Sequence, residues 1–78
     1  MKLPRGISGD RLILALERLG YSVIRQKGSH VRLRNEGPPA HMITVPLHRA
    51  LRMGTLHSIL SEVAQMRSIS VESIAELL

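Results

Sequence analysis

A glycine between two short runs of alternating residues constrains the fold of this chain most strongly. Residues 23–34 are predicted to form two β-strands joined by a tight turn at Lys27-Gly28, because glycine readily takes the positive φ that such turns need. Side chains alternate between the faces of a strand, so the second strand should have one apolar and one polar face. The residues on the polar face are His30, Arg32 and Arg34.

The position of this turn also predicts how the two strands pair. A two-residue turn at Lys27-Gly28 sets Arg25 directly opposite His30 in the neighbouring strand. We therefore expect a guanidinium beside the imidazole on one face of the hairpin.

Apolar residues at helical spacing predict three helices around this hairpin. Ser8 is a suitable N-cap for a helix over residues 10–19, and Gly20 is a suitable stop. Thr55 is predicted to cap a second helix, and Ser70 a short third one. Each helix would present one apolar stripe to a shared core.

The remaining segments complete the predicted topology. Residues 35–39 contain a glycine and two prolines, which indicates a loop, and residues 42–45 are predicted to form a third strand that ends at Pro46. The order α-β-β-β-α-α predicts an α+β fold, in which helices cover one face of a three-stranded antiparallel sheet. The other face would be open, and His30, Arg32 and Arg34 should lie on it.

Composition limits the range of functions. The chain has 78 residues, which we assign to one domain over residues 1–78, and its 11 Lys and Arg against 6 Asp and Glu give a net charge of +5. This balance favours a polyanionic partner, first a nucleic acid and then an acidic protein or membrane surface. Tyr21 is the only aromatic residue, so contacts to a nucleic acid should go to phosphate and sugar rather than to stacked bases.

Other classes of function find little support. The chain has no cysteine, and no apolar run approaches the roughly 20 residues that span a bilayer, so we expect a cytoplasmic protein without a membrane partner. The four histidines show no spacing typical of a metal site, and a glycine-rich phosphate loop is absent. We therefore expect neither a metal nor another cofactor.

Several stretches in order resemble the HicA (YcfA-like) toxins, small messenger-RNA interferases of toxin–antitoxin pairs. The shared stretches are Leu3-Pro4-Arg5 with Ser8-Gly9, Leu16 to Gly20, Arg25 to Leu33 with its Gly28-Ser29-His30, Thr44-Val45-Pro46, and Gly54-Thr55-Leu56 through Ile59-Leu60. They cover most of the chain. Gly-Ser-His alone is a weak signal, whereas all these stretches at these spacings make a specific one.

The resemblance implies a fold, an activity and a partner. The fold of the family is similar to the double-stranded-RNA-binding domain, which agrees with the predicted order. The active histidine of the family falls on His30, supported by the turn at Gly28 and Ser29. The implied activity is metal-independent cleavage of messenger RNA by the toxin of a type II toxin–antitoxin system. The implied protein partner is a HicB-like antitoxin.

The chemistry of RNA cleavage suits the residues around His30. The 2′-hydroxyl of RNA attacks the adjacent phosphorus, so a base must accept its proton, and histidine serves such transfers well. Arginine matches phosphate oxygens and stays charged, so cations near the histidine would bind the backbone. The predicted RNA-binding residues are Lys27, Arg25, Arg32 and Arg34. His48 is a candidate for the second proton carrier, and water could also serve.

Two other classes of function remain open. A non-catalytic nucleic-acid-binding module would use the same basic sheet face to recognise the shape of a duplex. A protein-interaction module would instead bind an acidic partner. A binding module should tolerate His30→Ala, whereas an enzyme should keep binding and lose turnover.

Overall fold

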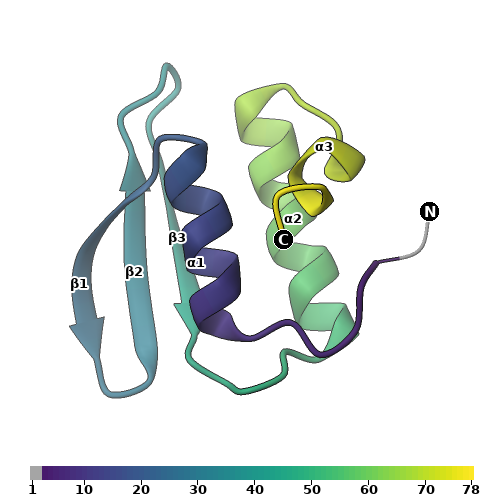
Figure 1. Ribbon diagram of the computed structural model, residues 1–78. Coiled ribbons are helices and arrows are strands. Elements are labelled where there is room, and N and C mark those ends of the chain that lie inside the picture. The colour runs from purple at the N-terminus through teal and green to yellow at the C-terminus, as the bar shows by residue number, and fades with distance from the viewer. Residues whose placement is uncertain (1–2) are drawn as a thin grey trace.

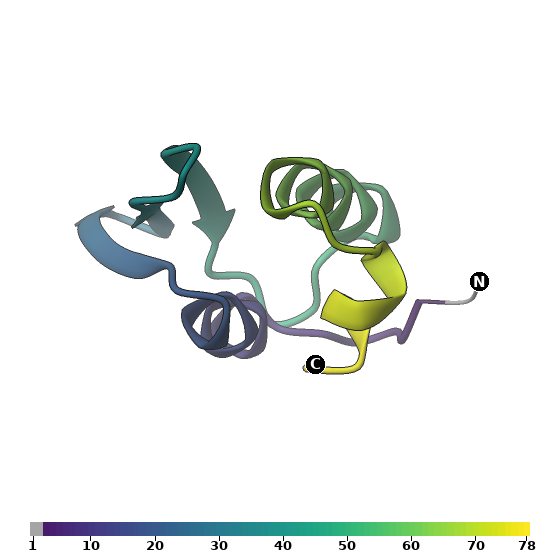
Figure 2. The ribbon, with the colours of Figure 1, turned by 90° about the horizontal axis from the view of Figure 1, so that it is seen from above.

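The computed structural model describes residues 3–78 and contains three helices and three strands in the predicted order (Figure 1). The elements are α1 (Gly9–Arg18), β1 (Ser22–Lys27), β2 (His30–Asn35), β3 (His41–Pro46), α2 (Met53–Arg67) and α3 (Val71–Ala75). The strands form one antiparallel sheet in the order β1-β2-β3. All three helices lie on the same side of this sheet, which confirms the predicted α+β fold (Figures 1 and 2).

The core lies between the sheet and helices α1 and α2. Every second residue of β2 and β3 points into it, and the apolar stripes of the helices cover these side chains. The largest fully buried side chains are Leu12, Leu16, Tyr21, Leu33, Val45, Leu56, Leu60, Val63 and Ile74. By contrast, β1 is exposed along its whole length, because the helices pack over the other two strands.

Three of the predicted helix ends are confirmed. The Ser8 hydroxyl accepts a hydrogen bond of 3.1 Å from the backbone N–H of Arg11 at the start of α1. Gly20, with φ 94°, follows the C-cap of that helix. Ser70 caps α3 by accepting a hydrogen bond of 3.1 Å from the N–H of Ser73.

The predicted N-cap of the second helix is wrong. Helix α2 begins at Met53, its N-cap is Arg52, and Thr55 lies within its first turn. The N-cap contributes no side-chain hydrogen bond. Gly54 lies within α2, which tolerates it because one glycine costs only about 1 kcal/mol relative to alanine.

The predicted register of the hairpin is also wrong, by one residue at the turn. The turn residues are Gly28 and Ser29, so Lys27 stands opposite His30, and Arg25 stands opposite Arg32. Gly28 has a φ of 58°, the conformation that a hairpin turn with glycine in its first central position requires. Gly28 is therefore the first of the two turn residues, whereas the predicted turn at Lys27-Gly28 had it second.

A β-bulge interrupts the same hairpin further from the turn. The register shifts between Val23 and Arg25, so Ile24 has no partner in β2. Beyond the bulge, Val23 pairs with Leu33.

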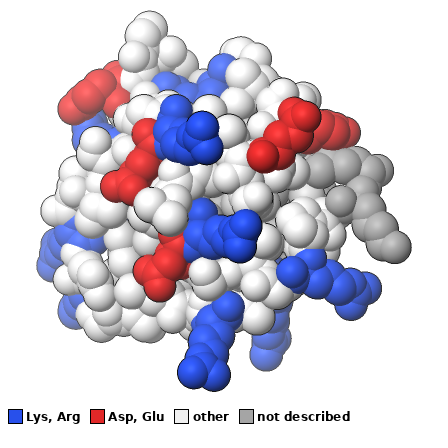
Figure 3. Space-filling view, viewed as in Figure 1, with Lys and Arg blue, Asp and Glu red and all other residues white. Residues whose placement is uncertain are grey.

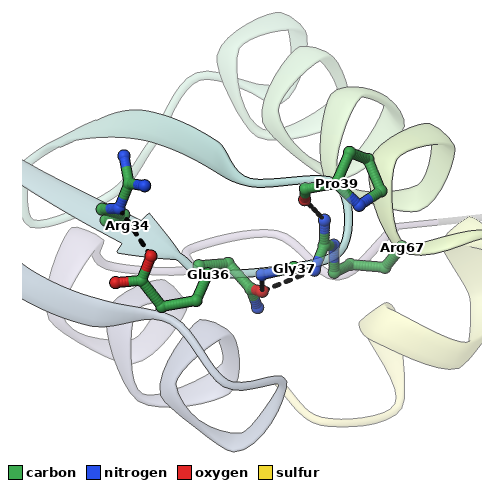
Figure 4. A network of polar contacts seen from close by, with 6 residues as sticks. Arg34, Glu36, Gly37, Pro39 and Arg67 are labelled. Carbon is green, nitrogen blue, oxygen red and sulfur yellow. Dashed lines mark hydrogen bonds and ion pairs between the residues drawn. The ribbon is translucent and has the colours of Figure 1, made fainter.

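The end of the sheet away from the turn carries a network of polar side chains. Asn35, only 6% exposed, donates to the carbonyl of Leu19 at 2.9 Å and accepts from the N–H of Gly37 at 2.8 Å. The Arg67 guanidinium donates to the Asn35 side chain and to the carbonyl of Pro39 (Figure 4). These contacts join the end of β2, the loop that follows it and the end of α2.

A second chain of contacts lies at the same end. The Tyr21 hydroxyl oxygen is 2.7 Å from Nδ1 of His41, and Nε2 of His41 is 2.7 Å from a carboxylate oxygen of Glu62. Burial raises the pKa of Tyr21, while the nearby Arg67 lowers it and Glu62 raises it further. His41 therefore links the start of β3 to α2.

Candidate active site

The open face of the sheet presents its side chains in rows that run across the strands. One row contains Lys27, His30 and Pro46, which pair across β1, β2 and β3. The neighbouring row contains Arg25, Arg32 and Thr44, and the next contains Ser22, Arg34 and Met42. The strand alternation predicted for His30, Arg32 and Arg34 is confirmed, because the intervening residues of β2 are buried.

The first two rows enclose a hollow of ≈ 280 Å³ on this face. Its lining residues are Arg25, Lys27, His30, Arg32 and Thr44. The structure thus brings His30 together with three of the four predicted RNA-binding residues. Thr44 was missed by the sequence analysis; its place in the alternation of β3 was the available signal.

Hydrogen bonds around the turn hold the row of His30 in position. The Gln26 side chain donates to the carbonyl of Gly28 at 3.1 Å, which braces the turn from within. The N–H of Leu47 donates to the carbonyl of Ser29 at 2.6 Å and ties the turn to the segment after β3. Gly28 and Ser29 therefore support the hollow through their backbone.

The electrostatics of the hollow are one-sided. Three of its five lining side chains are cations, and no carboxylate lines it within residues 3–78. No side-chain hydrogen bond occupies the imidazole of His30 in that part of the chain, and His30 is exposed. In the view of Figure 3, the charged side chains along the lower edge of the molecule are all basic, and the β1–β2 turn lies at this edge in Figure 1.

The site is thus an exposed imidazole among cations, next to the turn of a hairpin. Comparison of the sequence with known protein families identifies the chain that carries it. The family model for the HicA toxin of bacterial toxin–antitoxin systems matches residues 9–65, which include every residue of the hollow. This chain belongs to the HicA toxin family. No curated protein and no solved structure matches it.

Membership gives this HicA chain a role as the toxin of a toxin–antitoxin pair, with a cognate antitoxin as its partner. The match ends before Arg67, so this arginine, which joins α2 to the loop after β2, lies outside the matched segment. The hollow and the turn lie wholly within it.

Arg34 differs from the other predicted RNA-binding residues of this HicA chain. It lies in the third row of the open face, outside the hollow, and its Nε is 3.0 Å from a carboxylate oxygen of Glu36 (Figure 4). Its charge is therefore partly balanced, whereas Arg25, Lys27 and Arg32 have no such partner among the ion pairs of residues 3–78.

The other histidines of this HicA chain are separate from the hollow. His48 follows β3 and its carbonyl accepts a hydrogen bond of 2.9 Å from Gly9, but its side chain does not line the hollow.

Across residues 3–78, no three potential ligands among His, Cys, Asp and Glu gather into a group that would hold a metal ion. No helix in this described range has the length and apolar character needed to cross a membrane.

Proposed function

We propose that this toxin is a metal-independent endoribonuclease that cleaves messenger RNA and that His30 is its catalytic residue. The observation that supports this proposal is the hollow itself, in which an exposed imidazole stands beside three cations and no carboxylate. Such a site attracts a phosphodiester and offers an imidazole, a side chain suited to proton transfer. The family match supports a toxin, and RNA cleavage is the toxic chemistry that this hollow suits.

In the proposed reaction, His30 takes the proton of a ribose 2′-hydroxyl. The freed oxygen forms a bond to the adjacent phosphorus, and the bond from phosphorus to the 5′-oxygen breaks. The products are a 2′,3′-cyclic phosphate and a 5′-hydroxyl end, and water supplies the proton that the leaving oxygen takes up. Lys27 and Arg32 flank His30 and would neutralise the charge that builds on the phosphate oxygens.

Arg25 extends the same cationic surface by one strand. It pairs with Arg32 across the hairpin, and two guanidiniums in one row would hold successive phosphates of a single strand. We propose weaker binding for Arg34, since its charge is shared with Glu36. We further propose a HicB-like antitoxin as the partner and the cytoplasm, where messenger RNA is translated, as the location.

Cleavage of end-labelled single-stranded RNA in excess EDTA tests the proposal. We expect the wild type to cut and His30→Ala to cut about 10²–10⁴-fold more slowly, which is the usual contribution of a general acid or base. His57→Ala is the matched control, because it removes an exposed histidine from α2, away from the hollow, and should leave cleavage unchanged.

Three outcomes would contradict the proposal. Equal cutting by wild type and His30→Ala would mean that another residue or a contaminating nuclease acts. Loss of cutting in EDTA that returns with added Mg²⁺ would mean that a metal ion takes part. RNA binding without cutting by any variant would favour a non-catalytic binding module on the same face.

A further inference from the structure

Apart from the His30 imidazole, Thr44 has the one lining side chain of the hollow that is not a cation and can form hydrogen bonds. It lies in the middle of β3, directly opposite Arg32, and is half-buried. Its hydroxyl takes part in none of the side-chain hydrogen bonds formed within residues 3–78. A free hydroxyl therefore faces a site whose other members are three cations and an imidazole.

The three cations that line this hollow do not select RNA over DNA, and His30 is engaged by the attacking 2′-hydroxyl in the proposed reaction. Lysine and arginine contact phosphate, which DNA carries as well. The 2′-hydroxyl, which both donates and accepts hydrogen bonds, is the group by which a protein distinguishes RNA from DNA. A threonine hydroxyl has the same double capacity, so it can pair with a ribose hydroxyl in either direction.

On this basis, and resting on the proposed function, we infer that Thr44 binds a ribose 2′-hydroxyl and makes the hollow selective for RNA over DNA. His30 pairs with Pro46, so Thr44 is its diagonal neighbour in β3, a relation that sets the Cα atoms of the two residues about 7–8 Å apart. The hydroxyl that Thr44 holds belongs to the ribose next to the one whose 2′-hydroxyl attacks the phosphorus, because the attacking hydroxyl gives its proton to His30.

Binding measurements on a variant that does not cut its ligand test the inference. Thr44→Val is introduced into His30→Ala, since valine keeps the β-branched shape that suits a strand and loses only the hydroxyl. The ligands are one RNA oligonucleotide and the DNA of the same sequence. We expect His30→Ala to bind the RNA about fivefold more tightly than the DNA, which is the effect of one hydrogen bond, and Thr44→Val to remove this preference.

Ser22→Ala in the same background is the matched control. Ser22 pairs with Arg34 in the third row, so this variant also loses a hydroxyl from the open face, but outside the hollow. It should keep the RNA preference. Thermal unfolding of each variant checks that the fold is retained.

The outcomes separate this inference from the proposed function. An equal loss of RNA and DNA affinity in Thr44→Val, or an unchanged preference, would overturn the inference and leave His30 catalysis intact. If Thr44→Val removes the preference but His30→Ala cuts RNA as well as wild type does, the inference stands and the proposed catalyst is wrong. A protein that binds neither oligonucleotide refutes the inference.

Discussion

His30 and His41 each begin a strand of the same sheet, at opposite ends, and their surroundings differ completely. His30 is exposed, stands opposite Lys27 and forms no side-chain hydrogen bond within residues 3–78. Both ring nitrogens of His41 are occupied, one by Tyr21 and the other by Glu62. A histidine with two protein partners stabilises the fold, whereas one with free nitrogens and cationic neighbours is available for a ligand.

The arginines repeat this contrast. Arg67 is held by Asn35 and Pro39, and Arg34 by Glu36, all near the end of the sheet where His41 lies. Arg25 and Arg32 line the hollow near the turn. The molecule thus separates its polar groups into a paired end, which fastens the sheet to α2, and an unpaired end, which leaves its charge for a partner.

The largest effect on stability is expected at the paired end, from Asn35→Ala. This change leaves the carbonyl of Leu19, the N–H of Gly37 and the guanidinium of Arg67 without their partner in a buried place. We expect the free energy of unfolding to fall by about 3 kcal/mol, because each unsatisfied buried group costs about 1–3 kcal/mol. Urea denaturation measures this change.

Arg34→Ala is the control for Asn35→Ala, since it removes the neighbouring residue and an exposed ion pair. It should cost less than about 1 kcal/mol. If the two variants lost the same stability, the hydrogen bonds around Asn35 would not be what holds this end of the sheet to α2.

The next effect concerns the unpaired end and the binding of RNA. We expect Lys27→Gln with Arg32→Gln to reduce the salt dependence of single-stranded RNA binding by about 0.7 in logarithmic slope for each charge removed. Arg34→Gln should change the slope less, because Glu36 already balances part of that charge. Titrations at several salt concentrations measure the slopes, and equal changes for all three positions would remove the distinction between the two ends.

The smallest effect is a loss of stability at alkaline pH. Burial raises the pKa of Tyr21 in the folded chain above its unfolded value of about 10. The unfolded chain therefore releases this proton first, so the stabilisation is complete below about pH 10 and declines as pH rises through the folded pKa. Tyr21→Phe should flatten the fall in stability between pH 9 and 11; an unchanged slope would contradict the assignment.

Local patterns were sufficient to predict much of the fold. The helical stripes, the caps at Ser8 and Ser70 and the alternation along β2 each depend on a few neighbouring residues, and all are confirmed. Thr55 failed as a cap because α2 begins two residues earlier, at Met53, with Arg52 as an N-cap that contributes no side-chain hydrogen bond. The turn register failed because either neighbour of Gly28 could share the turn with it.

Only the residues of the candidate site that lie on one strand were brought together by the sequence pattern. The alternation of β2 placed His30 and Arg32 together on the open face, but Thr44 reaches the hollow through the pairing of β3 with β2. The contact of His41 with Glu62 likewise joins residues 21 positions apart. The alternation of a strand indicates the face on which a residue lies, whereas these contacts also depend on which elements pack side by side.

The bulge at Ile24 decides which side chains β1 contributes to each face. In a regular strand the odd-numbered residues Tyr21, Val23, Arg25 and Lys27 would all point toward the helices. The extra residue shifts the phase of the alternation by one, so Tyr21 stays in the core and both cations turn to the hollow. The one extra residue thus reverses which face of the sheet the odd-numbered side chains of β1 point to. The positive charge of the hollow therefore depends on the bulge at Ile24.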